Sequence, residues 1–205
     1  MKKVNAGSDL LIPKKRWVPE KEIQGTDEMV LLHPIMEEAY QNIVKLHRPK
    51  HKTALVSLCT STRPYSKSRK WKEFARLFGE HADLIICSNG GIIPIEFESC
   101  YPYLTYDAHG QAQYDRLYVR VVYRRLMEFF SAHHYDRIIF NFRPGLRNRA
   151  AALKFKETYT GNAEVLILPT QAGYKAAQAG GFPSGKMFPD LDKIVLGELS
   201  QAIYK

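Results

Sequence analysis

A short basic segment with one cysteine carries the clearest chemical signal in the sequence. Cys59 follows an apolar run, and the next residues hold five cations and no acid: Arg63, Lys67, Arg69, Lys70 and Lys72. Such a segment is typical of a loop that holds an anion. A thiol beside a guanidinium near the start of a helix has a lowered pKa, which makes Cys59 a candidate nucleophile. A buried, inert cysteine is the alternative.

A second segment combines carboxylates with aromatic side chains in residues 91–107. In an extended loop Glu96 and Glu98 project to the same side, so that one carboxyl group can be held protonated by the other and serve as an acid or base. Tyr101 and Tyr106 can stack on a nucleobase. Carboxylates that cap a turn and tyrosines that fill a core give the same pattern, and spacing alone does not separate the two interpretations.

A third segment, "RPGLRNR" at residues 143–149, places a Pro-Gly turn before a predicted helix. The free amides and the dipole at a helix start can receive an anion, and Arg143, Arg147 and Arg149 add positive charge there. An ordinary turn with solvated arginines is equally compatible with these residues.

Four short apolar runs must position these segments. They span residues 53–58, 83–88, 136–142 and 163–168, and helical stretches separate them. Continuous Val, Ile and Leu runs of this length indicate strands buried on both faces. The sequence therefore predicts an α/β fold: a three-layer sandwich with a central, mainly parallel four-stranded sheet. In such a sheet the ligand crevice lies beyond the carboxyl ends of the strands, where the three segments would meet if the first and third strands are neighbours.

The domain organisation predicted from this pattern is a single globular unit. Residues 1–50 form an N-terminal arm and a helix packed on the core, and residues 51–205 form the α/β domain. Helices are expected near residues 33–47, 69–80, 113–132, 146–159 and 189–204. In the third of these, Arg116, Arg120 and Arg124 form a basic stripe, which is either a ridge for phosphates or a solvated face. Arg125 falls in the apolar arc and should pair with an acid or reach a polar site.

Composition narrows the classes of partner and compartment. The net charge is +9, and residues 111–160 hold ten Lys plus Arg against four Asp plus Glu, which favours a polyanion such as nucleic acid over a merely solubilising surface. The three cysteines form no CxxC pair, and the histidines have no recognisable ligand spacing, so neither a metal nor a cofactor is expected. No apolar run is long enough for a signal peptide or a membrane span. We therefore expect a soluble, cytoplasmic protein with no membrane partner.

The stretch "GGFPSGKM" at residues 180–187 approaches a phosphate-binding P-loop, because Gly180, Gly185 and Lys186 have the GxxxxGK spacing. Met187 stands where a hydroxyl residue would contact magnesium, and Pro183 interrupts the loop. We therefore interpret this stretch as a flexible loop over the crevice.

Two of these segments resemble the archaeosine synthases, archaeal paralogues of tRNA-guanine transglycosylase that act on the 7-cyano-7-deazaguanine base (preQ0) of tRNA. Their signature runs Pro-Cys, three residues, Lys-Pro-Tyr, two residues, Ser, two residues, His. This chain has Cys59, Pro64, Tyr65 and Ser68 at matching spacing. The second segment also resembles the family's, and the residues that match it in order are Gly91, Pro94, Glu96, Glu98, Tyr101, Pro102, Tyr106 and Asp107. The resemblance covers roughly residues 30–110.

This resemblance implies a fold similar to that of uracil-DNA glycosylases. The chain departs from the signature at three positions, where Leu58, Arg63 and Trp71 replace the family's Pro, Lys and His. Arg63 keeps the positive charge but does not give up its proton as a lysine can, and Trp71 has no titratable nitrogen. The family's proton-transfer roles therefore do not carry over to these two positions.

The resemblance implies tRNA modification, with the base bound in the crevice and an amine, lysine in the synthases, added to its nitrile. Cys59 would attack or orient the nitrile, and Glu96 or Glu98 would transfer protons or hold the amine. The residues expected to bind the substrate are Arg63, Pro64, Tyr65, Ser68, Asn89, Tyr101, Tyr106 and Asp107. Those expected on RNA phosphates are Lys67, Arg69, Lys70, Arg143, Arg147 and Arg149.

Two alternatives to an enzyme of this type stay open. One is a non-catalytic module that binds tRNA or the base for a tRNA-modifying partner enzyme, which the replaced Lys and His positions favour. The other is a glycosylase-like enzyme acting on DNA bases, which rests on fold analogy alone.

Overall fold

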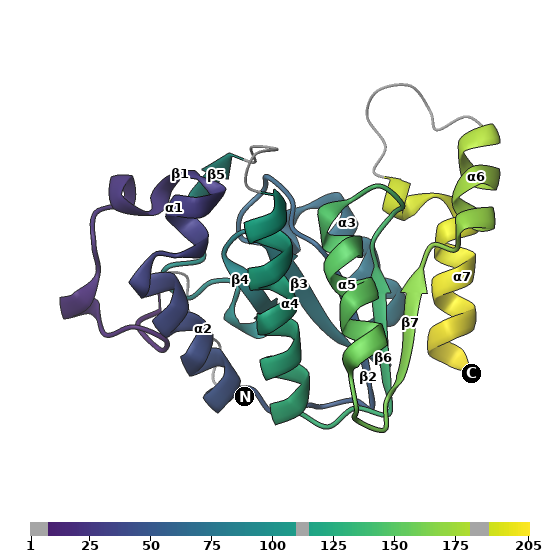
Figure 1. Cartoon of the computed structure of the whole chain (residues 1–205), viewed down its shortest axis with the longest axis horizontal. Helices are drawn as coiled ribbons and strands as arrows, with labels where there is room; N and C mark the ends of the chain where they lie inside the picture. The colour runs from purple at the N-terminus through teal and green to yellow at the C-terminus, as the bar shows by residue number, and fades with distance from the viewer. Residues whose placement is uncertain (1–7, 110–114, 181–188) are drawn as a thin grey trace.

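The computed structural model describes residues 8–109, 115–180 and 189–205 (Figure 1). At its centre is a five-stranded sheet in the order β4-β3-β2-β6-β7, in which β4 is antiparallel to β3 and the other neighbours are parallel. These strands are β2 (Thr53–Leu58), β3 (Asp83–Ser88), β4 (Gly91–Pro94), β6 (Arg137–Asn141) and β7 (Glu164–Leu168). A small second sheet pairs β1 (Gln24–Thr26) with β5 (Asp107–His109) in parallel.

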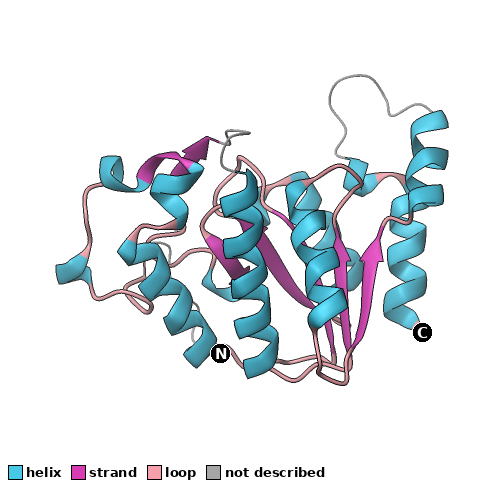
Figure 2. Cartoon of the chain, in the orientation of Figure 1, coloured by secondary structure: helices cyan, strands magenta, loops and turns pink. Residues whose placement is uncertain are grey.

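Helices cover both faces of the main sheet (Figure 2). The α-helices are α1 (Asp27–Leu31), α2 (Pro34–Leu46), α3 (Arg69–Phe78), α4 (Asp115–Ala132), α5 (Arg147–Thr158), α6 (Gln171–Ala179) and α7 (Lys193–Tyr204). In Figure 1, α4 and α5 lie on one face, whereas α3 lies on the other, where the Phe78 and Tyr204 rings join it to α7. Crossovers between parallel strands are right-handed. Because the chain adds β3 on one side of β2 and β6 on the other, the helices of the two crossovers lie on opposite faces of the sheet.

The predicted α/β class is confirmed, and the four apolar runs are all strands. Both faces of β2 and β3 are buried, which explains their unbroken apolar sequences. The prediction of four strands was wrong: β4, only four residues long, adds an antiparallel fifth strand beside β3. The signal for this fifth strand was the dipeptide Asn89-Gly90, which is typical of a two-residue hairpin turn and here joins Ser88 to its cross-strand neighbour Gly91.

The five predicted helices are all present, with α2, α3, α4, α5 and α7 at the expected places. The short helices α1 and α6 were not predicted. Leu11, Ile12 and Ile23 of the N-terminal arm are buried in the same hydrophobic core as the strand residues. The arm is therefore part of the packed structure, and the division at residue 50 stays a prediction.

Arg125 faces the core, as its helical phase predicted. Its side chain is fully buried and its guanidinium donates hydrogen bonds to Glu37 Oε2 at 3.0 Å, to the Leu31 carbonyl at 2.9 Å and to the Gly90 carbonyl at 3.4 Å. One cation thus joins α1, α2 and the β3–β4 turn to α4.

The stretch at residues 180–187 lies, apart from Gly180, outside the described residues. Within the described part of the chain, every helix is too short or too polar to span a membrane.

Candidate functional site

A cavity of about 390 Å³ lies at the carboxyl ends of β2 and β3. We call it the Arg63 cavity, and its lining comes from two loops and β5: Cys59, Thr60, Ser61, Arg63, Asn89, Tyr106, Asp107 and Ala108. It sits where parallel α/β sheets place their ligands, since β2 has the later strand β6 on one side and β3 on the other. The sequence-predicted residues Cys59, Arg63, Asn89, Tyr106 and Asp107 therefore share one hollow.

Arg63 lies over the ring of Tyr106, with its guanidinium carbon 4.3 Å from the ring centroid, and the Tyr65 ring is 5.4 Å away. Its Nε atom is buried without a hydrogen-bond partner. A guanidinium stacked on an aromatic ring is held flat and keeps its charge, which suits it to bind an anionic oxygen or to stack on a base.

A chain of hydroxyl groups holds the two loops of the cavity together. The Tyr65 and Tyr106 hydroxyls are 2.7 Å apart, and the Tyr106 hydroxyl donates to Ser88 Oγ at 2.8 Å. Burial raises the pKa of both tyrosines, so these hydroxyls stay protonated at neutral pH. Gly90 permits this packing, because a Cβ there would lie 3.0 Å from Cζ of Tyr106.

Cys59 lines the cavity, but its thiol is not activated. Burial raises its pKa, and the opposing charges of Lys70 and Arg63 do not reverse that effect. The expectation of a lowered pKa, and with it a ready thiolate at neutral pH, is therefore wrong.

The two carboxylates, Glu96 and Glu98, do not line the cavity. Residues 95–97 form a 3-10 turn rather than an extended loop, so the two side chains point to different partners. Glu98 is buried and accepts a hydrogen bond from the Ser66 amide at 2.8 Å, which fixes the basic loop. Glu96 is displaced because β4 runs antiparallel and returns the chain to the opposite edge of the sheet.

At that opposite edge Glu96 joins a buried polar cluster. Its Oε1 is 2.8 Å from His47 Nδ1, the other nitrogen of His47 contacts the Tyr135 hydroxyl at 2.8 Å, and Tyr135 donates to Asp83 at 3.1 Å. This chain of contacts ties α2 to β3 and to the start of β6, so we assign Glu96 a structural role.

His133 packs edge-on against His47 in this cluster, and burial together with His47 and Arg48 lowers its pKa to about 4. The unfolded chain takes up this proton near the ordinary value of 6.5. The stability that neutral His133 contributes is therefore fully present above pH 6.5 and is lost as the pH falls toward 4. We expect about 2 kcal/mol of this loss between pH 7 and pH 5.

Urea unfolding of the wild type and of His133→Leu at both pH values checks this expectation. The variant should lose less stability on acidification than the wild type. His134→Leu, which changes an exposed neighbour, should keep the wild-type pH dependence. Equal pH dependence of His133→Leu and the wild type would contradict the assignment.

Some of the predicted phosphate-binding residues are exposed, and the others are engaged by groups of the protein itself. Lys67, Arg69 and Arg143 are exposed. Arg149 donates to the carbonyls of Phe142 and Pro169 at 2.6 and 3.0 Å. These backbone contacts occupy part of its guanidinium.

Arg147 lies beside the cavity rather than in its lining. It contacts Asn89 Oδ1 at 3.3 Å and Asp115 Oδ1 at 3.2 Å, and its guanidinium covers the Tyr118 ring at 3.8 Å. Because β2 and β6 are neighbours, the loop after β6 does meet the crevice, and Arg147 carries that contact.

Lys70 is not on the surface. Only 1% of it is exposed, and its Nζ lies 3.1 Å from Asp190 and 2.6 Å from the Leu58 carbonyl. It lies in the first turn of α3, two residues after the N-cap Ser68, and it belongs to the buried face of that helix. A phosphate outside the protein does not reach it, which corrects the expectation for this residue.

Four predicted substrate-binding residues lie outside the cavity lining: Pro64, Tyr65, Ser68 and Tyr101. Tyr101 stacks on Trp17, with the two ring centroids 4.5 Å apart. Ser68 Oγ accepts a hydrogen bond from the Trp71 amide at 3.3 Å, and Pro64 precedes the turn that carries Tyr65. Ser88, Thr60 and Ser61 were missed. The available signal for these three residues was a hydroxyl side chain at the end of a buried strand or just after it, where the cavity lies.

No group of three or more His, Cys, Asp or Glu side chains is placed to hold a metal ion within the described residues.

These features define an α/β protein whose small cavity lies at the carboxyl edge of a largely parallel sheet. Residues 37–167, more than half of the chain, match the family described as a domain of unknown function, DUF5591. The chain belongs to that family. None of the curated proteins matches the sequence.

The fold is also similar to a solved structure, the crystal structure of AF0587, a protein of unknown function. The TM-score is 0.57 at 17% sequence identity, and the match covers 81% of this chain and 49% of that one. This chain therefore spans about half the length of that protein. At this identity the similarity supports the fold alone.

Proposed function

We propose that the Arg63 cavity binds a 7-deazaguanine base of the preQ0 type in tRNA, as the resemblance to the archaeosine synthases implies. The fold would then be of the uracil-DNA-glycosylase type. The observation that carries the proposal is the stacked Arg63–Tyr106 pair in the same cavity as the polar side chains of Asn89 and Asp107.

The chemistry of the lining suits a base attached to a polyanion. The Asp107 carboxylate can accept hydrogen bonds from the two N–H groups that a guanine-type base presents on its pairing edge. The Asn89 side-chain amide can both donate and accept a hydrogen bond. The cavity volume lies within the roughly 300–1,000 Å³ of sites that enclose small molecules. Lys67 and Arg143 lie in the connections that follow β2 and β6, and Arg69 is the first residue of α3; all three are exposed and would meet the RNA backbone there.

A protein that uses a base in RNA must take it out of the stack, and an extruded base needs a pocket with stacking and edge contacts. The Arg63 cavity offers both kinds of contact. We therefore place binding ahead of chemistry, since Glu96 and Glu98 lie outside the cavity and Cys59 is a protonated thiol at neutral pH.

The test compares binding of preQ0-containing tRNA and the same tRNA unmodified, by fluorescence anisotropy. The wild type should prefer the modified tRNA. Arg63→Ala should weaken that binding about 10- to 100-fold, because it removes a charged hydrogen-bonding group worth about 1.5–3 kcal/mol. Arg76→Ala, which removes an equal charge from an exposed pair with Glu73, should change it little. Equal affinity for the two tRNAs, or an unchanged Arg63→Ala, would contradict the proposal.

Amine addition to the nitrile is a second candidate function, favoured by Cys59 and Asp107 lining the same cavity. The reaction forms one C–N bond at the nitrile carbon, breaks one π bond of the nitrile, moves one amine proton to the nitrile nitrogen and releases nothing. Incubating the protein with preQ0-containing tRNA and lysine should then raise the nucleoside mass by that of one lysine. An unchanged mass, with an authentic synthase active in parallel, would leave binding as the function.

A further inference from the structure

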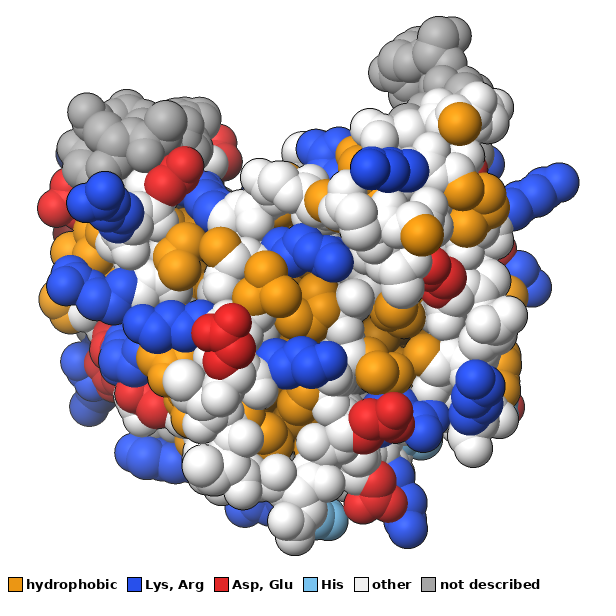
Figure 3. Space-filling model, turned by 45° about the vertical axis from the view of Figure 1, so that its right-hand side comes forward, with side chains coloured by type: hydrophobic (Ala, Val, Ile, Leu, Met, Phe, Trp, Pro, Cys, Tyr) orange, Lys and Arg blue, Asp and Glu red, His pale blue; other side chains and the backbone are white. Residues whose placement is uncertain are grey.

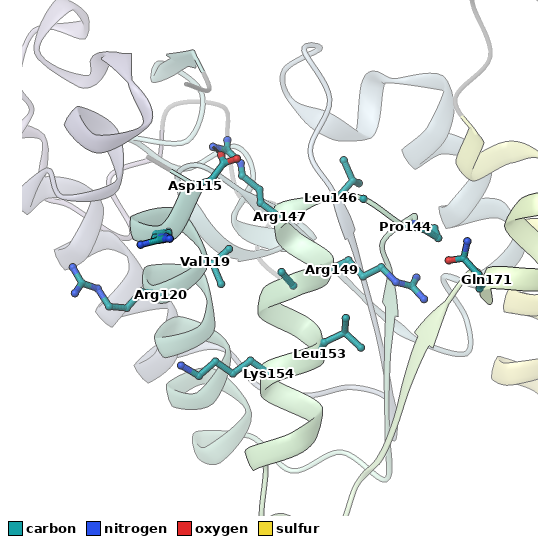
Figure 4. Close-up of a pocket in the computed structure, with 13 residues that line it drawn as sticks. Asp115, Val119, Arg120, Pro144, Leu146, Arg147, Arg149, Leu153, Lys154 and Gln171 are labelled. Atoms are coloured by element: carbon teal, nitrogen blue, oxygen red, sulfur yellow. Dashed lines mark hydrogen bonds and ion pairs between the residues drawn. The ribbon is translucent and has the colours of Figure 1, made fainter. Parts of the chain in front are cut away.

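A larger groove lies on the face of the molecule formed by α4 and α5 (Figure 4). We call it the α4–α5 groove. It has a volume of about 720 Å³, runs across the outer side of α5 and reaches the start of α6 at Gln171. As far as the chain is described, the groove and the Arg63 cavity share no lining residue.

The floor of this groove is aliphatic. Val119 of α4 and Leu146, Ala150 and Leu153 at α5 supply it, and Leu153 is 45% exposed. Figure 3 shows hydrophobic surface between basic side chains on this face of the molecule. An exposed apolar surface with a charged border is typical of a protein-interaction site.

The border of the groove is basic. Arg116 and Arg120 of α4 are exposed, and neither has an ion-pair partner among the described residues. Arg124, one turn further along the same stripe, differs because Glu37 and Glu128 bind it at 2.8 and 3.0 Å. Lys154 adds a third cation from α5, where Figure 4 shows it extending toward α4.

The acidic content of the groove does not balance these cations. Among the described residues of its lining Asp115 is the one carboxylate, and its Oδ1 lies 3.2 Å from Arg147. The basic stripe of α4 therefore divides into two parts. Arg124 is neutralised by Glu37 and Glu128, whereas Arg116 and Arg120 border an apolar floor without a balancing acid among the described residues.

We propose that the α4–α5 groove docks an amphipathic helix of a partner protein, with an apolar face flanked by Asp or Glu. Helix-in-groove recognition uses apolar anchors at i, i+3 or i+4, and i+7, which matches an aliphatic floor. The acidic flanks would meet Arg116, Arg120 and Lys154. Single-stranded RNA is the less suitable occupant, because bases stack on aromatic rings and the described residues that line the groove include none.

The dimensions suit a short helix. At 1.5 Å per residue, α4 and α5 are about 27 and 18 Å long, so a partner helix of three to four turns could contact the groove along its length. Arg147 borders this groove and also contacts Asn89 of the Arg63 cavity, so a docked partner would lie beside the proposed base site.

The experiment selects binders for the full-length protein from a displayed library of random 16-residue peptides, and measures the affinity of the enriched peptides by fluorescence anisotropy. The enriched peptides should share apolar residues at helical spacing with Asp or Glu on both flanks. Leu153→Glu and Arg120→Glu should each weaken their binding at least tenfold. Lys14→Glu, an identical charge reversal on the exposed η1 turn (Lys14–Arg16), should leave it within twofold.

Circular dichroism shows whether each variant is folded, and Arg120→Glu keeps the test decisive if Leu153→Glu fails to fold. Enrichment of basic or non-amphipathic peptides, or binding that both groove variants leave unchanged, would overturn the proposal. So would a 12-nucleotide single-stranded RNA that binds the wild type, loses affinity with Arg120→Glu and displaces the enriched peptides, since the groove would then be an RNA site.

Discussion

Replacing Arg125 with Met is expected to lower the free energy of unfolding by about 3–5 kcal/mol. The substitution keeps the apolar stem and removes the guanidinium that joins α4 to the elements around it. Two backbone carbonyls, those of Leu31 and Gly90, then lose a buried donor, and Glu37 loses one of its two cations.

The cost is large because Arg125 has no route to solvent. Its side chain is 0% exposed, so water cannot replace the lost hydrogen bonds. Glu37 shows the strength of the arrangement: although its partial burial acts in the opposite direction, the hydrogen bond from Arg124 and the charge of Arg125 lower its pKa to about 2.

The neighbouring residue provides the matched control. Arg124 also binds Glu37, but its side chain is 45% exposed, so Arg124→Met should cost about 1 kcal/mol or less. Urea unfolding followed by circular dichroism measures both variants. If both lose the same stability, the guanidinium of Arg125 is not the junction that its contacts indicate.

The buried strands and the cavity residues next to them were the most predictable parts of the molecule. Runs such as residues 53–58 are apolar on both faces, because a strand that helices cover on both sides of the sheet must bury side chains on both faces. Because parallel strands end at one edge, Cys59 and Asn89 had to lie near one another once β2 and β3 were recognised as strands. Arg63 and Tyr106 follow from the loops attached to those ends.

The positions of Glu96 and Lys70 were not predictable by the same reasoning. Glu96 depends on a four-residue strand whose pairing reverses the chain, so missing β4 placed the carboxylate at the wrong edge of the sheet. Lys70 depends on Asp190, which is distant in sequence. A cation in a basic loop looks like surface until the partner that buries it is known, and nothing local to residues 58–72 identifies that partner.

Replacing Lys70 with Met is the second large perturbation, with an expected loss of about 3–5 kcal/mol in the free energy of unfolding. The side chain is 1% exposed, and its removal leaves the Asp190 carboxylate, itself 11% exposed, without its cation. The Leu58 carbonyl at the end of β2 also loses its buried donor.

Lys72→Met, two residues further along α3 and exposed, should change the unfolding free energy by less than about 0.5 kcal/mol. The double variant Lys70→Met with Asp190→Leu separates a stranded charge from lost packing. Because replacing both members of a buried ion pair by apolar residues is often neutral, the double variant should recover most of the stability lost by Lys70→Met alone. If it recovers none, the ion pair is not the cause of the loss, and the junction between α3 and the segment around Asp190 depends on the lysine stem or its hydrogen bond to Leu58 instead.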